Sequence, residues 1–202
     1  MSWIKIISPD DSTGKLKMIY DRVKTPGKRV DNILQVHSLR PHTLEGHMSL
    51  YKNVLHSNQN TLPKWFLETI GVYVSLLNQC DYCTDHHYAG LSRLLIGQPG
   101  KAPKILDALK SNSFVDLFTA KEKLLLGYVN KLTLNPGLIT KSDIDSLQDS
   151  GIDDGEILEV NQVAAYFAYA NRTVLGLGTT TDGDELGLSP HNSDDPNDWS
   201  HQ

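Results

Sequence analysis

A stripe of apolar residues with helical spacing is the feature that most constrains how this chain can fold. Between Leu62 and Leu77 the apolar side chains recur at intervals of three and four residues, which predicts an α-helix with one buried face. Thr61 as N-cap and Pro63 just inside the helix are typical of a helix start. Alternating apolar and polar runs, the pattern of a half-buried strand, are scarce throughout the chain. The predicted fold class is therefore all-α.

Further helices are predicted from capping and stop signals. Thr119 with Glu122, and Asp153 with Glu156, resemble capping boxes and each predicts a helix start, the second helix reaching about Leu175. Four more helices are expected at residues 12–23, 31–38, 41–57 and 81–97.

The length and composition favour one domain followed by a polar tail. The chain has 202 residues, of which 39% are hydrophobic and 21% charged, as in an ordinary globular protein with one core. We expect a helical domain over residues 1–178 and a tail over residues 179–202 that lacks a core of its own. Its apolar residues are isolated among polar ones and include Leu186, Leu188 and Trp199. The tail is expected to be a disordered terminus or an arm that lays these residues on a neighbouring subunit.

Charge and hydropathy exclude several classes of protein. The formal net charge is -5 and the basic residues are scattered, whereas a nucleic-acid-binding protein usually carries a basic face. No apolar run has signal-peptide character or approaches the ~20 residues of a membrane span. The sequence predicts a soluble, cytoplasmic protein with neither nucleic acid nor membrane as partner.

The only two cysteines, Cys80 and Cys83, are too close in sequence to stabilise the fold by closing a long loop. In a reducing compartment such a pair is typically catalytic or metal-binding. If a helix begins near Asp81, Cys83 lies in its first turn, where the helix dipole favours a thiolate. His87 then lies one turn further on the same face. Cys83 is thus expected to attack a peroxide and form a sulfenic acid, which Cys80 condenses into a disulfide.

Glu68 can reach His87 only if the chain doubles back between the two residues. In an antiparallel helical hairpin Glu68 and His87 differ in depth by only ~7 Å, which their side chains can span. Geometry permits this contact without demanding it, and taken alone such a glutamate is more often a solvated residue at the edge of the apolar stripe.

Glu68, Cys80, Cys83 and His87 together match a motif of Glu, eleven residues and Cys-x-x-Cys-x-x-x-His. In this the chain resembles the alkylhydroperoxidase D-like (AhpD-like) proteins, in the peroxidase-related branch of the carboxymuconolactone decarboxylase superfamily. The resemblance continues in three further segments, Val74–Asn78, Gly151–Val160 and Tyr166–Arg172.

The resemblance implies an all-helical homo-oligomer with the motif on a helical hairpin and no cofactor or bound metal. It implies an antioxidant oxidoreductase that acts on small hydroperoxides, with Cys83 peroxidatic, Cys80 resolving, and Glu68 and His87 as a proton relay. Better-known members take electrons from a lipoyl-bearing adaptor, so an external dithiol is the expected reductant. Tyr82 departs from the pattern, because the best-studied members carry a histidine immediately before the second cysteine. Tyr82 is expected to donate a hydrogen bond at the site or to pack in the core, and His86 to lie at the surface.

Other functions fit part of this pattern. Zinc could be bound by Cys80, Cys83 and His86 or His87, although no fourth ligand is evident in the sequence. A thioredoxin-like disulfide exchanger would have a strand before its Cys-x-x-Cys, and a lactone decarboxylase of the related fold needs no cysteine pair. A disulfide oxidoreductase without peroxidase activity and a catalytically idle helical oligomer stay open. We favour a peroxide reductase.

Overall fold

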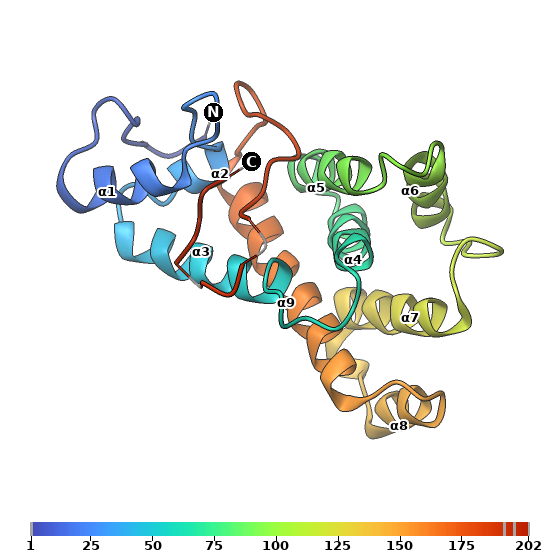
Figure 1. Cartoon of the computed structure of the whole chain (residues 1–202). Helices are drawn as coiled ribbons and strands as arrows, with labels where there is room; N and C mark the ends of the chain where they lie inside the picture. The colour runs from blue at the N-terminus through green and yellow to red at the C-terminus, as the bar shows by residue number, and fades with distance from the viewer. Residues whose placement is uncertain (1, 192, 196, 202) are drawn as a thin grey trace.

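The computed structural model describes residues 2–191, 193–195 and 197–201. Within these ranges the chain forms nine α-helices and one short 3₁₀ helix, and its only β pairing is an isolated bridge between Pro190 and His201. The predicted all-α fold is confirmed (Figure 1). The helices are α1 (Gly14–Val23), α2 (Asn32–Gln35), α3 (Pro41–Leu55), α4 (Lys64–Leu77), α5 (Asp81–Leu94), α6 (Lys101–Ser111), α7 (Ala120–Leu134), α8 (Lys141–Asp149) and α9 (Asp154–Leu177), with the 3₁₀ helix at Pro136–Leu138.

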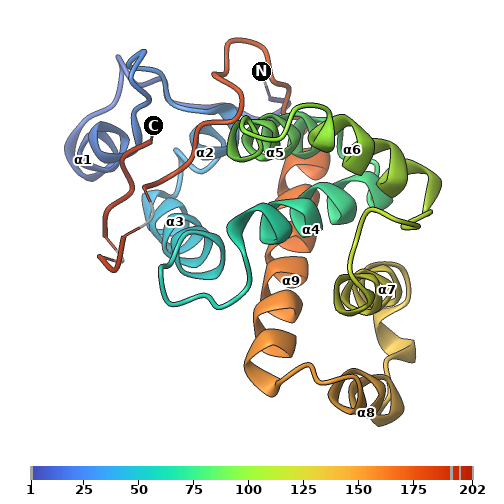
Figure 2. The ribbon, with the colours of Figure 1, turned by 45° about the vertical axis from the view of Figure 1, so that its right-hand side comes forward.

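Helix α4 lies at the centre of the fold and contacts α3, α5, α6, α7 and α9. Helices α1 to α3 lie on one side of it and α6 to α8 on the other, while the long α9 crosses it (Figures 1 and 2). No helix in the described ranges has the length and apolar character needed to cross a membrane.

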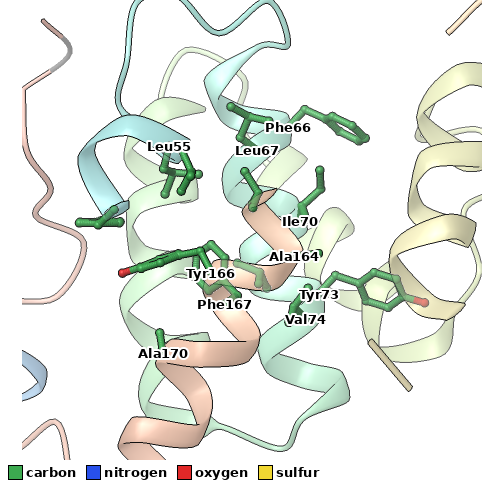
Figure 3. Packing of buried hydrophobic residues seen from close by; sticks show 14 of the residues in the cluster. Leu55, Phe66, Leu67, Ile70, Tyr73, Val74, Ala164, Tyr166, Phe167 and Ala170 are labelled. Carbon is green, nitrogen blue, oxygen red and sulfur yellow. The ribbon is translucent and has the colours of Figure 1, made fainter. Parts of the chain in front are cut away.

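The core is built around α4 on all sides. Every residue from Phe66 to Ser75 is buried, so the single buried face predicted from the sequence is too narrow. Figure 3 shows Ile70 and Val74 of α4 meeting Ala164 and Phe167 of α9. Because the neighbouring helices leave no solvated face along this stretch, Glu68 is enclosed in the protein with the apolar residues around it.

Helix boundaries follow the sequence signals closely, with some corrections. The capping boxes at Thr119 and Asp153 are both present. Pro63 is itself the N-cap of α4, and Thr61 instead hydrogen-bonds the carboxylate of Glu159. Two helices were not predicted: α6, and α8, which begins with a capping box at Thr140.

A tight turn joins α4 and α5 into the expected antiparallel hairpin. Gln79 has a positive φ of 58°, a left-handed conformation that reverses the chain within a few residues. The N–H of Cys80 donates to the carbonyl of Ser75 at 2.9 Å, which closes the turn. Cys80 is therefore the N-cap of α5 and Cys83 lies in its first turn.

The polar tail returns over the helices of its own chain (Figure 1). Trp199 is only 4% exposed, and the guanidinium of Arg22 lies 3.8 Å from the centre of its ring. The buried Lys52 donates to the carbonyl of His191 and to the hydroxyl of Ser193. Trp199 is thus buried within its own chain, where the sequence analysis considered a contact with a neighbouring subunit.

Substitution of Gly71 by alanine tests the packing of α4 against α9. A Cβ at Gly71 would overlap the ring of Phe167, whereas a Cβ at the helical Gly127 would meet no atom within 4 Å. We predict that Gly71→Ala destabilises the fold by about 1–3 kcal/mol through overpacking. Gly127→Ala is expected to stabilise it by about 0.5–1 kcal/mol through helix propensity. Urea unfolding of both variants measures the difference, and equal free energies of unfolding would contradict the packing described here.

Candidate active site

The two cysteines are buried free thiols in direct contact. Their Sγ atoms are 2.9 Å apart, and Cys80 and Cys83 are 1% and 3% exposed. Asn171 of α9 also hydrogen-bonds the sulfur of Cys83. The amide of Asn171 is itself held by Ser75 and Asn78, at 3.1 and 2.9 Å. The pair is therefore fixed between the start of α5 and the buried face of α9.

The sulfur atoms titrate as a pair, because a hydrogen bond joins them. The hydrogen bond with Cys83 lowers the pKa of Cys80. The same bond, followed by burial, raises the pKa of Cys83 well above its ordinary value, and the hydrogen bond from Asn171 offsets only part of this rise. In this arrangement the hydrogen bond and burial oppose the helix-dipole effect that favours a thiolate at Cys83.

Glu68 and His87 form the contact that the hairpin made possible. The carboxylate Oε2 of Glu68 is 2.8 Å from Nδ1 of His87, and the Glu68 side chain is almost fully buried. The imidazole also packs edge-on against Phe167, with ring centres 4.4 Å apart. Such a carboxylate fixes the orientation of the imidazole and leaves Nε2 as the nitrogen that can exchange a proton.

These groups share one cavity of about 40 Å³. Cys83, Glu68 and His87 all line it, whereas Cys80 does not. The tail forms part of its wall through residues 187–189 and His201. A larger hollow of about 200 Å³ adjoins it at Glu68, Gly90 and the tail, and is lined on its outer side by Lys64 and Arg93. Cys83 is thus the sulfur that a molecule in the cavity meets.

Tyr82 and His86 belong to a second polar group beside the cysteines. The hydroxyl of Tyr82 donates to Oδ2 of Asp184 at 2.6 Å and accepts from the N–H of Ile33 at 3.0 Å. Nε2 of His86 is 3.1 Å from the same carboxylate, and its ring stacks on Tyr82 at 4.6 Å. Burial and Asp184 raise the pKa of Tyr82 well above its usual value, so the phenol stays protonated. The prediction that His86 is a surface residue is wrong, because Asp184 of the tail covers it.

Three residues of the site were missed by the sequence analysis. Asn171 lies in a segment quoted for the family resemblance and was given no role. Asp31, which lines the cavity, and Asp184 carried no local signal, because the tail and α2 come together only in the fold. Among the described residues, no group of three or more His, Cys, Asp or Glu side chains is arranged to hold a metal ion.

The fold is similar to that of several solved structures. An uncharacterized peroxidase-related protein from Ralstonia eutropha JMP134, described as an alkylhydroperoxidase AhpD core, is 18% identical with a TM-score of 0.75, over 91% of this chain and 93% of its own. A peroxidase-related protein from Silicibacter sp. TM1040 is 21% identical with a TM-score of 0.72, over the same shares of the two chains. The debrominase Bmp8 is 15% identical with a TM-score of 0.68, over 90% of this chain and 91% of its own.

No protein-family model and no curated protein matches the sequence. The structural likeness nevertheless extends over about nine tenths of this chain and of each of these relatives. The chain therefore has the AhpD-like fold that its Glu-Cys-Cys-His motif predicted.

Proposed function

We propose that this protein is a thiol-dependent peroxidase that reduces small hydroperoxides. The observation that supports this most is the arrangement of Cys83, which lines a cavity together with the Glu68–His87 pair and has Cys80 in direct contact with its sulfur. A nucleophilic sulfur, a second thiol within reach and an oriented base form a complete two-electron site.

In the first step the Cys83 thiolate attacks the outer oxygen of the hydroperoxide. The Sγ–O bond forms as the O–O bond breaks, which gives a sulfenic acid on Cys83 and expels an alkoxide. Because a hydrogen bond joins Cys80 and Cys83, the charge reaches Cys83 when the proton moves to Cys80. His87, oriented by Glu68, takes up the second proton of the pair.

In the second step Cys80 attacks the sulfur of the Cys83 sulfenic acid. The new S–S bond releases water, so the balance is one hydroperoxide and two thiols converted to one alcohol, one water and one disulfide. The short distance between the sulfur atoms favours this closure over further oxidation of Cys83. An external dithiol restores the pair by exchange, and a lipoyl-bearing adaptor is the donor that the family resemblance suggests.

Reductive dehalogenation is a second candidate, favoured by the aromatic wall of the cavity. The rings of Tyr51 and Tyr166 stack with centres 5.3 Å apart, and His47 lies 5.7 Å from Tyr166. The similar debrominase Bmp8 was solved with 2,3,4-tribromopyrrole. Thiolate attack on bromine, protonation of the ring carbon and disulfide closure would convert an aryl bromide and two thiols to the arene, bromide, a proton and a disulfide. Bromide release from such a compound, without peroxide reduction, would favour this candidate.

The cysteines are tested by turnover of tert-butyl hydroperoxide with a dithiol reductant. Cys83→Ser is expected to lower turnover to background, because it removes the nucleophile. Cys80→Ser is expected to lose multiple turnover, because the sulfenic acid has no internal partner. Circular dichroism confirms that each variant is folded. If both variants equal the wild type, the mechanism proposed here is wrong.

Glu68→Gln tests the role of the carboxylate in orienting His87. Gln keeps the size of the side chain but removes its charge, so we expect the rate of peroxide reduction to fall about 10- to 100-fold. Glu156→Gln is the control, since Glu156 is a mostly buried carboxylate paired with Lys121 on a different part of the fold. A Glu68→Gln rate within about twofold of the wild type would remove Glu68 from the mechanism.

Gly187→Ala tests whether the tail limits access to Cys83. Gly187 has a φ of 80°, and a Cβ there would lie 2.8 Å from the carbonyl carbon of Ala89 on α5. Gly183 has a φ of 88° with open space around it, so Gly183→Ala carries the same backbone strain without the contact. A clash of about 1.4 kcal/mol increases the open population about tenfold, and alkylation of Cys83 should accelerate by a similar factor. Equal alkylation rates for the two variants would show that the tail does not control access.

A further inference from the structure

Asp31 is the N-cap of α2, yet its side chain does not cap that helix. An aspartate in this position ordinarily accepts a hydrogen bond from the second or third N–H of the helix. Here the N–H of Asn32 donates to the carboxylate of Asp184, at 3.0 and 3.2 Å, and the N–H of Ile33 donates to the Tyr82 hydroxyl at 3.0 Å. Groups from the tail and from α5 therefore cap α2, and the Asp31 carboxyl makes no capping hydrogen bond.

That carboxyl lies in the wall of the cavity that holds Cys83. Asp31 is 6% exposed, and its Oδ1 atom is buried without a hydrogen-bond partner. A buried carboxylate that lacks partners is costly, so the protonated form is favoured. Burial, and then the charges of Asp184 and Glu185, raise the pKa of Asp31 to about 7 against the opposing effect of His86. Near neutral pH much of Asp31 is a carboxylic acid.

Peroxide reduction at Cys83 requires a proton for the departing alkoxide oxygen. The expelled alkoxide is strongly basic, the attacking thiolate brings no proton, and Glu68 with His87 serves to accept the proton of the thiol pair. A neutral carboxylic acid in the same cavity meets this need, as other buried acids do in enzymes. A cavity of about 40 Å³ also exceeds the ~10–15 Å³ needed for one water molecule, so a hydroperoxy group has room in the cavity that Asp31 and Cys83 both line.

We propose that Asp31 is the general acid of the reaction and protonates the departing alkoxide as the O–O bond breaks. This inference rests on the proposed peroxidase function. The Cys83 thiolate, the hydroperoxide and the Asp31 carboxylic acid become the sulfenic acid, the alcohol and the Asp31 carboxylate. Solvent returns the proton to Asp31 before the next turnover.

The surroundings of Asp31 define its pH dependence. His86 and Tyr82 of α5, Tyr51 of α3, and Asp184 and Glu185 of the tail are the titratable groups that act on it. The protonated form of Asp31 is the active one. Its contribution to the rate of peroxide reduction is therefore complete below the pKa of Asp31 and is lost as the pH rises through about 7. Reduction of an alkyl hydroperoxide should therefore fall above this pH even though more thiolate is present.

The test compares two oxidants in single-turnover oxidation of the full-length protein at neutral pH. tert-Butyl hydroperoxide has a poor leaving group that needs a proton, whereas peroxybenzoic acid leaves as benzoate and needs none. Asp31→Asn should slow oxidation by tert-butyl hydroperoxide about 100-fold or more, while the rate with peroxybenzoic acid stays near that of the wild type. Asp31→Glu should recover part of the rate, and Asp182→Asn, an exposed neighbour on the tail, should change neither reaction.

Each outcome decides the matter. Equal slowing with both oxidants would reduce Asp31 to a structural role and overturn the proposal, as would no slowing with either. A wild-type protein that reduces neither oxidant would instead contradict the peroxidase function itself.

Infrared difference spectroscopy adds a measurement independent of turnover, because the wild type should show a carboxylic acid C=O band that disappears as the pH rises through about 7 and is missing in Asp31→Asn. A wild type without that band would also overturn the proposal.

Discussion

The antiparallel pairing of α4 and α5 is the interaction on which the site depends. The left-handed Gln79 turns the chain so tightly that the two helices run back along each other from Cys80 onward. That register brings the carboxylate of Glu68 to His87 although 19 residues separate them in sequence. It also fixes Cys83 in the first turn of α5, beside the buried Asn171 of α9. A shift of α4 against α5 by one turn would separate Glu68 from His87.

The C-terminal tail is a structural part of the site. Asp184 joins the tail to two helices, since its carboxylate binds the start of α2 and both the Tyr82 hydroxyl and His86 of α5. Gly187 packs tightly on α5 and helps to close the cavity over Cys83. A cavity partly shielded from solvent strengthens the electrostatic effects within it, and the tail forms part of the wall of this cavity.

Much of the fold and the motif could be predicted from the sequence, because both depend on local patterns. Helical periodicity, capping boxes and stop signals predicted seven of the nine helices in the described part of the chain, and the spacing of Glu68 and His87 suggested their contact. Partners brought together by the tail could not be predicted. His86 was placed at the surface because nothing near it in sequence indicates Asp184, 98 residues away. The hydrogen bond between the sulfur atoms of Cys80 and Cys83 depends on a distance that spacing along a helix does not determine.

The central claim is that Cys83 and Cys80 act as one two-electron unit on a peroxide. Mass spectrometry of the reduced wild-type protein after one equivalent of tert-butyl hydroperoxide tests this most directly. The account predicts a mass decrease of two hydrogens, with a peptide map that assigns the new disulfide to Cys80 and Cys83. An unchanged mass, or added oxygen with both thiols still free to alkylate, would contradict it.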